Sequence, residues 1–141
     1  MTAIEFLDQY RVLSMKVDSL RAEYQAQREA IDSIKTSLEG EGGRTLEISR
    51  PVERMAVKLA EKAEELKEAE AEALRIRQEI VEVIMDVPGV AGRVLYERFV
   101  LLKHWGDVAA AVGYEKRQVQ RYYKKGLELV AGKKCCHTMS H

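Results

Sequence analysis

The 141-residue sequence has few of the residues that build sheets and disulfide-rich scaffolds, since 6% of its residues are aromatic and it holds 9 Gly, 2 Pro and 2 Cys. A β-sandwich needs more turn residues and more aromatic residues than this. No apolar run approaches the roughly 18 residues of a membrane span, and residues 1–5 lack the basic and apolar layout of a signal peptide. We therefore expect an all-α, cytoplasmic protein with no membrane partner.

The sequence also lacks a net charge, because 23 Lys and Arg residues balance 23 Asp and Glu residues. The two sides of Pro88-Gly89, the clearest break in the pattern, nevertheless differ. Residues 1–89 hold 13 basic and 19 acidic residues, a net charge of −6, whereas residues 90–141 hold 10 basic and 4 acidic residues, a net charge of +6. This asymmetry predicts that the C-terminal half binds a polyanion and that the N-terminal half has another role.

Apolar residues recur in the N-terminal half at alternating spacings of four and three, which is typical of a coiled-coil seam. One seam predicts a helix over about residues 3–38, and a second predicts a helix over about residues 51–87. Gln27 and Lys62 are the polar interruptions, and either could specify the register of the helices. The seam positions are Phe6, Tyr10, Leu13, Val17, Leu20, Tyr24, Gln27, Ile31, Ile34 and Leu38 in the first helix and Val52, Met55, Leu59, Lys62, Leu66, Ala69, Ala73, Ile76, Ile80, Val83 and Val87 in the second.

The segment Gly40-Glu41-Gly42-Gly43 between the seams is interpreted as a flexible connector. Ser49 as a cap and Pro51 in the first turn predict where the second helix begins, and Pro88-Gly89 predicts where it ends. Two helices of similar length joined by a short loop predict a long antiparallel helical hairpin, a coiled coil, over residues 1–89. Because two helices alone bury little apolar surface, we expect a homo-oligomer through residues 1–89. The heptads could pair within one chain, between chains, or both.

Residues 90–132 divide into three short helical patterns, which predict a small three-helix helix-turn-helix domain. Trp105 precedes the short second helix as an apolar anchor, and Gly113 separates the second helix from the third. His104 is predicted to cap the second helix or to contact a phosphate. The apolar positions of the three patterns are Val94, Leu95, Phe99 and Leu102, then Val108, Ala109 and Val112, then Val119, Tyr122, Leu127 and Val130.

The third helix, residues 115–131, carries the predicted chemistry. If its apolar positions and Gly126 face the core, helical spacing turns a basic, polar face outward. Arg and Gln side chains fit guanine and adenine edges, and Lys suits phosphate. We therefore predict that this helix lies in the major groove of double-stranded DNA. Its predicted DNA-binding residues are Lys116, Arg117, Gln118, Gln120, Arg121, Lys124 and Lys125, with Tyr123 beside them.

Residues 107–127 resemble the promoter-reading helix-turn-helix of bacterial sigma factors and of sigma-factor-like regulators carried by phages. The resemblance rests on the Val108-Ala109 pair, the Gly113 turn, the basic start of the next helix, its Val119 and the Gly126-Leu127 pair. The whole layout is similar to phage late-transcription regulators of the ArpU/RinA kind. The sequence departs from that family at Tyr122, where a smaller aliphatic residue is usual, and at Gly126, where Ala is usual and Gly weakens a helix by about 1 kcal/mol. The resemblance implies that Lys116, Arg117, Gln120 and Arg121 read or grip DNA.

Residues 133–141 are predicted to be a flexible tail. The tail holds Cys135, Cys136, His137 and His141, which are residue types that bind zinc. No flanking apolar pattern holds them in place, so we predict no metal and no other cofactor. The chain also lacks a Ser/His/Asp set and a nucleotide-binding motif, and we expect no enzyme activity.

These observations predict a phage or prophage transcription regulator in the cytoplasm of a bacterial host cell. Its basic half is expected to bind promoter DNA, and its helical half to oligomerise or to contact host RNA polymerase. Two alternatives stay open. A small terminase subunit, which packages DNA, would form a ring of many subunits, and a helical-hairpin protein that binds RNA polymerase or a sigma factor would ignore DNA at physiological salt.

Overall fold

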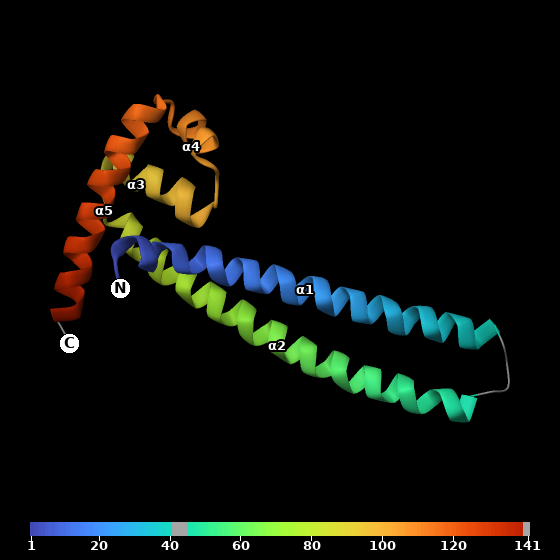
Figure 1. The fold of residues 1–141 in the computed structure, drawn as a ribbon. Coiled ribbons are helices and arrows are strands. Elements are labelled where there is room, and N and C mark those ends of the chain that lie inside the picture. The colour runs from blue at the N-terminus through green and yellow to red at the C-terminus, as the bar shows by residue number, and fades with distance from the viewer. Residues whose placement is uncertain (41–44, 140–141) are drawn as a thin grey trace. The chain divides into compact units, whose positions relative to one another are not determined.

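The computed structural model describes the backbone of residues 1–40 and 45–139 and the side chains of residues 1–37 and 50–133. In those ranges the protein is all-α, as predicted, and contains no strand. None of its helices there combines the length and the apolar run that crossing a membrane requires. The elements are α1 (Ala3–Gly40), α2 (Thr45–Met85), α3 (Gly89–Leu95), the π-helical turn η1 (Tyr96–Val100), α4 (Trp105–Val112) and α5 (Lys116–Met139) (Figure 1).

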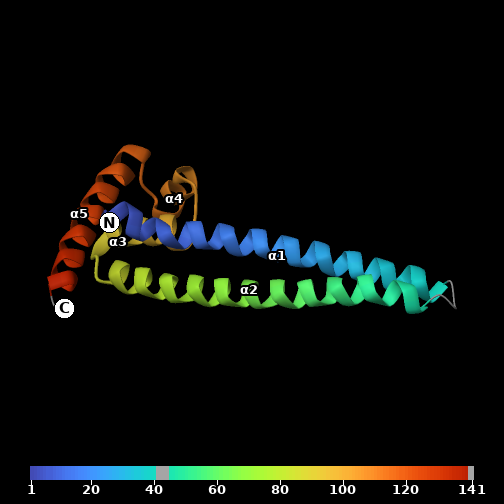
Figure 2. The ribbon, with the colours of Figure 1, turned by 60° about the horizontal axis from the view of Figure 1, so that its bottom comes forward.

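The chain divides into two compact units, one of residues 14–72 and one of residues 1–13 together with 73–141. Each unit contains a segment of α1 beside a segment of α2, as two views show (Figures 1 and 2). The division by contacts therefore differs from the predicted boundary between residues 89 and 90. The physical reason is that the start of α1 and the end of α2 supply apolar side chains to the core around α3 and α5.

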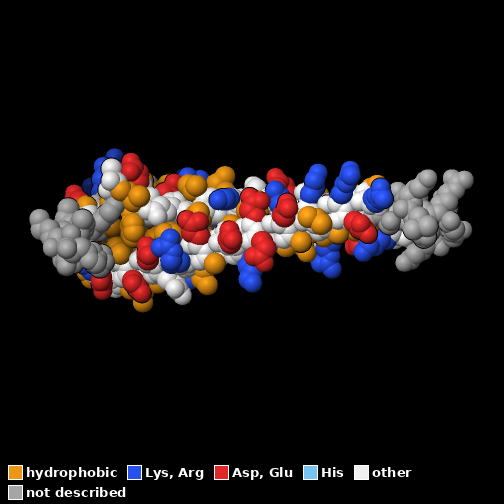
Figure 3. Space-filling model, turned by 90° about the horizontal axis from the view of Figure 1, so that it is seen from below, with side chains coloured by type: hydrophobic (Ala, Val, Ile, Leu, Met, Phe, Trp, Pro, Cys, Tyr) orange, Lys and Arg blue, Asp and Glu red, His pale blue; other side chains and the backbone are white. Residues whose placement is uncertain are grey.

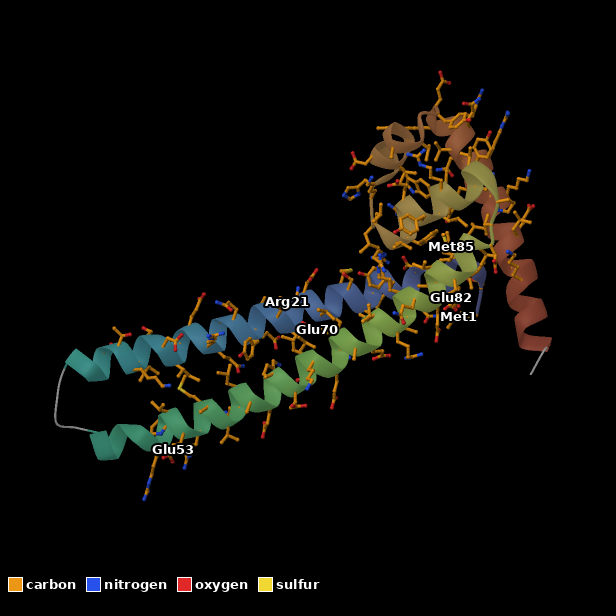
Figure 4. The ribbon with its side chains drawn as sticks, turned by 180° about the vertical axis from the view of Figure 1, so that it is seen from behind. Met1, Arg21, Glu53, Glu70, Glu82 and Met85 are labelled. Atoms are coloured by element: carbon orange, nitrogen blue, oxygen red, sulfur yellow. The ribbon has the colours of Figure 1, made fainter. Side chains whose placement is uncertain are left out.

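In the unit of residues 14–72, the predicted seams face inward. Val17, Leu20, Ile31 and Ala69 are buried, and the other seam positions with described side chains are half-buried. Arg21 of α1 contacts Glu70 of α2, with 3.0 Å between Nη2 and Oε1 (Figure 4). Glu23, two residues further along α1, meets a residue earlier in α2, so the two helices run in opposite directions. On the face seen in Figure 3, acidic and basic side chains are interspersed.

The two polar seam residues have different surroundings. Lys62 reaches the edge of the seam, where its Nζ lies 2.5 Å from Glu23 Oε2 and 3.7 Å from Glu65 Oε2. The hydrogen bond to Glu23 raises the pKa of Lys62 above its ordinary value. Gln27 holds a buried Oε1 that has no hydrogen-bond partner among the described residues. A lysine is therefore accommodated in the seam because its charge is neutralised at the rim, whereas Gln27 leaves one acceptor unsatisfied.

The second long helix begins earlier than predicted. α2 starts at Thr45, so that Pro51 lies inside the helix instead of in its first turn, and Ser49 does not mark the start. A proline in a helix removes one backbone hydrogen bond and crowds the preceding turn, but it leaves the other bonds of the helix in place. The prediction of a helix start at residues 49–51 is wrong for this reason. Residues 41–43 of the predicted connector lie outside the described residues.

The other unit is built on one apolar cluster that joins four helices. Leu7 of α1 and Ile76, Ile80 and Ile84 of α2 pack with side chains from the following helices. Leu7, Ile80 and Ile84 are at most 2% exposed. Leu7 and Ile84 lie outside the predicted seams, because at this end both helices share one apolar cluster with side chains of α3, η1 and α5. The remaining buried members are Val87, Ala91, Leu95, Phe99, Val100 and Val130.

The helix before the predicted helix-turn-helix pair ends in an unusual way. α3 passes into η1, and the N–H of Leu101 donates to the carbonyl of Tyr96 at 3.1 Å, while the N–H of Lys103 donates to the carbonyl of Glu97 at 3.1 Å. Leu102 between them has a φ of 57°, in the left-handed region. The prediction that Leu102 belongs to the first short helix is therefore wrong, since the backbone has already left the helix at this residue.

Gly126 lies where α5 crosses α3, and its absent side chain allows the close approach. A Cβ at this position would lie 2.9 Å from Leu95 Cδ1 and 3.1 Å from Leu95 Cγ. Leu95 is 0% exposed and has little room to move. Close packing against Leu95 therefore explains why glycine is present at this position. The resemblance to sigma-factor-like helix-turn-helices, in which alanine is usual here, did not reveal this reason.

Replacing Gly126 by alanine is expected to destabilise the unit by about 1 kcal/mol, because overpacking costs of about 1–3 kcal/mol exceed a helix-propensity gain of about 1 kcal/mol. Gly132→Ala in the same helix is the matched control, since nothing lies within 4 Å of its would-be Cβ. The control should stabilise the protein. Urea unfolding followed by Trp105 fluorescence measures both, and a stabilised Gly126→Ala variant would contradict the close contact of α3 with α5.

Candidate nucleic-acid interface

A tight turn connects α4 to α5. Gly113 has a φ of 76° in the left-handed region, and its N–H donates to the carbonyl of Ala109 at 2.9 Å. The N–H of Tyr114 donates to the same carbonyl at 3.3 Å. Glycine adopts this backbone conformation without strain, so the turn can be short and α5 can begin at Lys116. The predicted break at Gly113 is confirmed.

The inner side of α5 is the predicted one. Val119 and Val130 are at most 1% exposed, Gly126 is buried, and Tyr122 and Leu127 are half-buried. Val119 packs against Val94 of α3 and Val108 of α4 in a second small cluster. Three helices thus meet at Val119, which fixes the rotation of α5 about its own axis.

The outer side of α5 carries the seven predicted residues, which we call the basic face. All seven side chains are exposed. Among the described residues, no ion pair involves any of the five cations of this face. By contrast, five basic side chains elsewhere on the helices and one in the loop before α4 do form ion pairs. The structure therefore brings the predicted residues together on one exposed surface. They are Lys116, Arg117, Gln118, Gln120, Arg121, Lys124 and Lys125.

Tyr123 does not belong to the basic face, beside which the sequence placed it. Its ring stacks on Phe99 at a centroid distance of 6.2 Å and meets the edge of Trp105 at 4.7 Å. Burial raises the pKa of the Tyr123 hydroxyl above its ordinary value. Tyr122 and Tyr123 both pack inward because the close contact at Gly126 brings this part of α5 against α3 and η1. The Tyr123 ring therefore stabilises the domain instead of extending the interface.

The loop that enters α4 is held by Glu97 and Arg98. Lys103 Nζ lies 2.6 Å from Oε2 of Glu97, whose side chain is 12% exposed. Arg98 Nη1 donates to the Lys103 carbonyl at 2.8 Å, and its guanidinium lies 4.8 Å from the centroid of the Trp105 ring. Trp105 is thus anchored as predicted, against Tyr123 and beneath a cation. These contacts fix the start of α4 relative to the helix before it.

His104 occupies the cap position of α4 but makes no side-chain capping hydrogen bond. The capping alternative is therefore wrong for the side chain, and the phosphate contact stays a prediction; the extended backbone at His104 starts the helix without a side-chain cap. At the other end of α4, Arg93 of α3 donates from Nη2 to the Ala111 carbonyl at 2.8 Å. Arg93 was not among the predicted residues, since a single arginine in a short helix carries no recognisable signal. Its bond ties α3 to the last turn before the Gly113 turn.

The first turns of α1 add an acidic group to this unit. Arg11 donates to Asp8 through Nε and Nη2, both at 2.7 Å from the carboxylate oxygens. This hydrogen bonding lowers the pKa of Asp8 below its ordinary value of 3.8, and the charge of Arg98 adds to the effect while burial opposes it. The carboxylate is therefore charged at neutral pH, and it lies near enough to η1 to interact with a residue that holds the α4 loop.

The tail continues the helix. α5 extends to Met139, beyond the predicted domain end at residue 132 and into the segment 133–141 that the sequence predicted to be a flexible tail. No proline interrupts residues 133–139, and Lys133 lies 3.7 Å from Asp86 of the α2–α3 turn. Among the described side chains, no three metal-ligating residues gather. The side chains of Cys135, Cys136, His137 and His141 lie outside the described ones, so the metal prediction for them stays a prediction.

No protein-family model matches the chain, and neither a curated protein nor a solved structure matches it significantly.

Proposed function

We propose that this protein is a phage or prophage DNA-binding transcription regulator that acts at promoters, with α5 in the major groove. One observation carries the proposal. The basic face is exposed, and its cations pair with no acidic side chain among the described residues, on a helix that follows a tight glycine turn. A helix presented in this way is the usual element that reads base edges in helix-turn-helix proteins. The proposal includes the bacterial cytoplasm as its place of action and no enzyme activity.

The side chains of the basic face differ in what they can recognise. Arg117 and Arg121 each present a planar fork that fits guanine, and Gln118 and Gln120 can bind adenine through paired hydrogen bonds. Lys116, Lys124 and Lys125 carry compact charges suited to phosphate oxygens. In this proposal the lysines supply affinity and position the helix, and the arginines and glutamines supply sequence selectivity.

The proposed domain arrangement is that α3 with η1, α4 and α5 form a three-helix helix-turn-helix domain. Contacts among all three elements support it. The proposal also treats α1 and α2 as an antiparallel coiled-coil hairpin, which the inward-facing seams and the Arg21–Glu70 pair support. In function, the hairpin oligomerises the protein or contacts host RNA polymerase.

The test is DNA binding by the full chain, with Arg117→Ala/Arg121→Ala as the variant. We expect the double variant to lose at least about tenfold in affinity for double-stranded DNA, since a base or phosphate contact is worth about 1–3 kcal/mol. Wild-type affinity should also fall steeply between about 50 and 200 mM salt because bound phosphates release counterions. Fluorescence anisotropy with a labelled duplex measures both.

The matched control removes the same charge from another surface. Arg28 and Arg54 are exposed arginines of α1 and α2, and neither forms an ion pair among the described residues. Arg28→Ala/Arg54→Ala should change the affinity less than about twofold, because neither residue belongs to the basic face and salt screens the field of other surface charges. Equal affinities of the two double variants would contradict the assignment of α5 as the DNA-binding helix.

A further inference from the structure

α1 presents a second, outward face that its seam does not use. Its positions follow the spacing 12, 15, 19, 22 and 26, which is again three and four; the next step of this spacing reaches Glu29, and Ala30 and Ser33 continue the uncharged positions on the same side. All of these side chains are exposed, and Glu29 is the charged one among them. Val12 is 55% exposed and Met15 is 58% exposed. We call the uncharged set the outer face of α1; it consists of Val12, Met15, Ser19, Ala22, Ala26, Ala30 and Ser33.

The charged side chains of α1 lie beside this face. At about 100° per residue, the outer face lies on the side of the helix opposite the seam. Apart from Glu29, the charged residues of this stretch fall between the two apolar stripes. A helix with apolar residues on two opposite sides has a second neighbour to pack against, since an exposed valine and methionine gain nothing from water.

We propose that a second copy of this chain covers the outer face, with the two α1 helices packed antiparallel. The size of the side chains along the face selects this arrangement. Large residues lie at one end, at Val12 and Met15, and alanines lie at the other, at Ala26 and Ala30. In antiparallel pairing Met15 meets Ala26 of the second copy, so the largest side chain of the face lies opposite a small one, and Ser19 meets Ala22, both of which are small. Parallel pairing would leave the alanines facing one another.

The flanking charges select the same direction. Antiparallel pairing places Lys16 about two residues, or roughly 3 Å along the axis, from Glu23 of the second copy, whose carboxylate also pairs with Lys62 of its own chain, and the two-fold symmetry repeats this arrangement. Parallel pairing would instead place Arg11 beside Lys16 and Asp18 beside Glu23, since these pairs have the five-residue offset of neighbouring helices in parallel coiled coils. Both of those pairs carry like charges. The contact along residues 12–30 would extend for about 27 Å.

This inference rests on the proposed oligomerisation of the helical half and is independent of DNA binding by α5. Its experiment uses the full chain with Cys135→Ser/Cys136→Ser, so that the introduced thiols are the only ones. Met15→Cys and Ala26→Cys chains are prepared separately and mixed under mild oxidation. In the antiparallel dimer, residue 15 of one chain adjoins residue 26 of the other. The two residues 15 lie roughly 16 Å apart along the axis, which is too far for a disulfide.

We expect a disulfide-linked dimer in the mixture and none in either chain alone. A linked dimer of Met15→Cys alone would indicate parallel pairing and overturn the proposal. The absence of any link in the mixture would overturn it too. Because no DNA is present, these outcomes are separate from the result of the α5 variants.

A second measurement uses charge instead of thiols. Ala26→Glu should raise the dimer dissociation constant at least about tenfold, because it places a carboxylate inside the paired faces. Ala60→Glu is the matched control, as Ala60 is also an exposed alanine and lies on α2. Sedimentation equilibrium measures both, and circular dichroism verifies that each variant is folded. An equal or larger effect of Ala60→Glu would assign self-association to α2 and overturn the proposal.

Discussion

Gly92→Ala is expected to lower the free energy of unfolding by about 3 kcal/mol, because it forces a methyl group into a closely packed turn. A Cβ at Gly92 would overlap the carbonyl oxygen of Val87 and lie 3.2 Å from the carbonyl carbon of that residue. Backbone atoms cannot rotate away as a side chain can. The methyl group therefore has to push α3 away from the end of α2.

The consequence reaches the core of the unit. Ile84 and Val87 before the turn and Ala91 and Leu95 after it belong to one apolar cluster. Moving α3 relative to α2 separates these side chains and opens space that nothing fills. Because Leu95 also contacts the position of Gly126, the displacement is transmitted to α5.

The control is the same substitution where there is room. Gly106→Ala in α4 places a Cβ with nothing within 4 Å, and it should stabilise the protein by up to about 1 kcal/mol. Urea denaturation monitored by the single tryptophan, Trp105, and by circular dichroism measures both variants. If Gly92→Ala and Gly106→Ala gave the same stability, the close approach of the Val87 carbonyl to α3 would be refuted.

Leu7→Ala is expected to destabilise the unit that carries the basic face by about 3 kcal/mol, within the range of about 2–5 kcal/mol for such truncations. Leu7 is 0% exposed and packs in the cluster that includes Ile80, Leu95 and Val130. Leu7 therefore belongs to the same core as residues of α3 and α5, although α3 begins some 80 residues further along the chain. Alanine would leave a cavity among side chains from four helices.

Two measurements separate this effect from a general weakening of α1. Trp105 fluorescence follows unfolding around α4 and α5, since the Trp105 ring packs against Tyr123. Ile4→Ala, three residues earlier and 49% exposed, is the control and should cost less than about 1 kcal/mol. An unchanged Trp105 transition in Leu7→Ala would mean that residues 90–139 fold without α1.

Leu7 also bears on how the DNA-binding proposal can be tested. A fragment that begins at residue 90 would lack Leu7, Ile76, Ile80 and Ile84, which are core residues of the unit. Such a fragment exposes the apolar sides of α3 and α5 to water. Point substitutions on the basic face of the full chain therefore test DNA binding more directly than truncation does.

Much of the architecture follows from spacing alone. The seams of both long helices were predicted residue by residue, and the inward set of α5, from Val119 to Val130, was predicted from the same periodicity. The exposure of the basic face follows from that set, because the positions of one side of a helix determine those of the other. The class of fold and the Gly113 turn were likewise readable.

The errors share a different origin. Thr45 rather than Ser49 begins α2, Leu102 lies past the end of a helix, and the His104 side chain makes no capping hydrogen bond. Each prediction treated a local sequence preference as decisive, whereas tertiary context routinely overrides such preferences. Tyr123 was misplaced because the contact of α5 with η1 adds a second buried side to the helix.

The sequence by itself determined that the chain is helical, which residues of each helix face inward, and that seven polar residues share one side of α5. Those properties depend on the 3.6-residue period, which is a property of the backbone. Only the tertiary structure decided that Leu7 and Ile84 complete the core around α3 and α5, that the units do not divide at Pro88, and that Gly92 and Gly126 mark close approaches. These features depend on which helices meet and how closely they approach. Packing between segments that are distant in the sequence leaves no periodic pattern in the sequence itself.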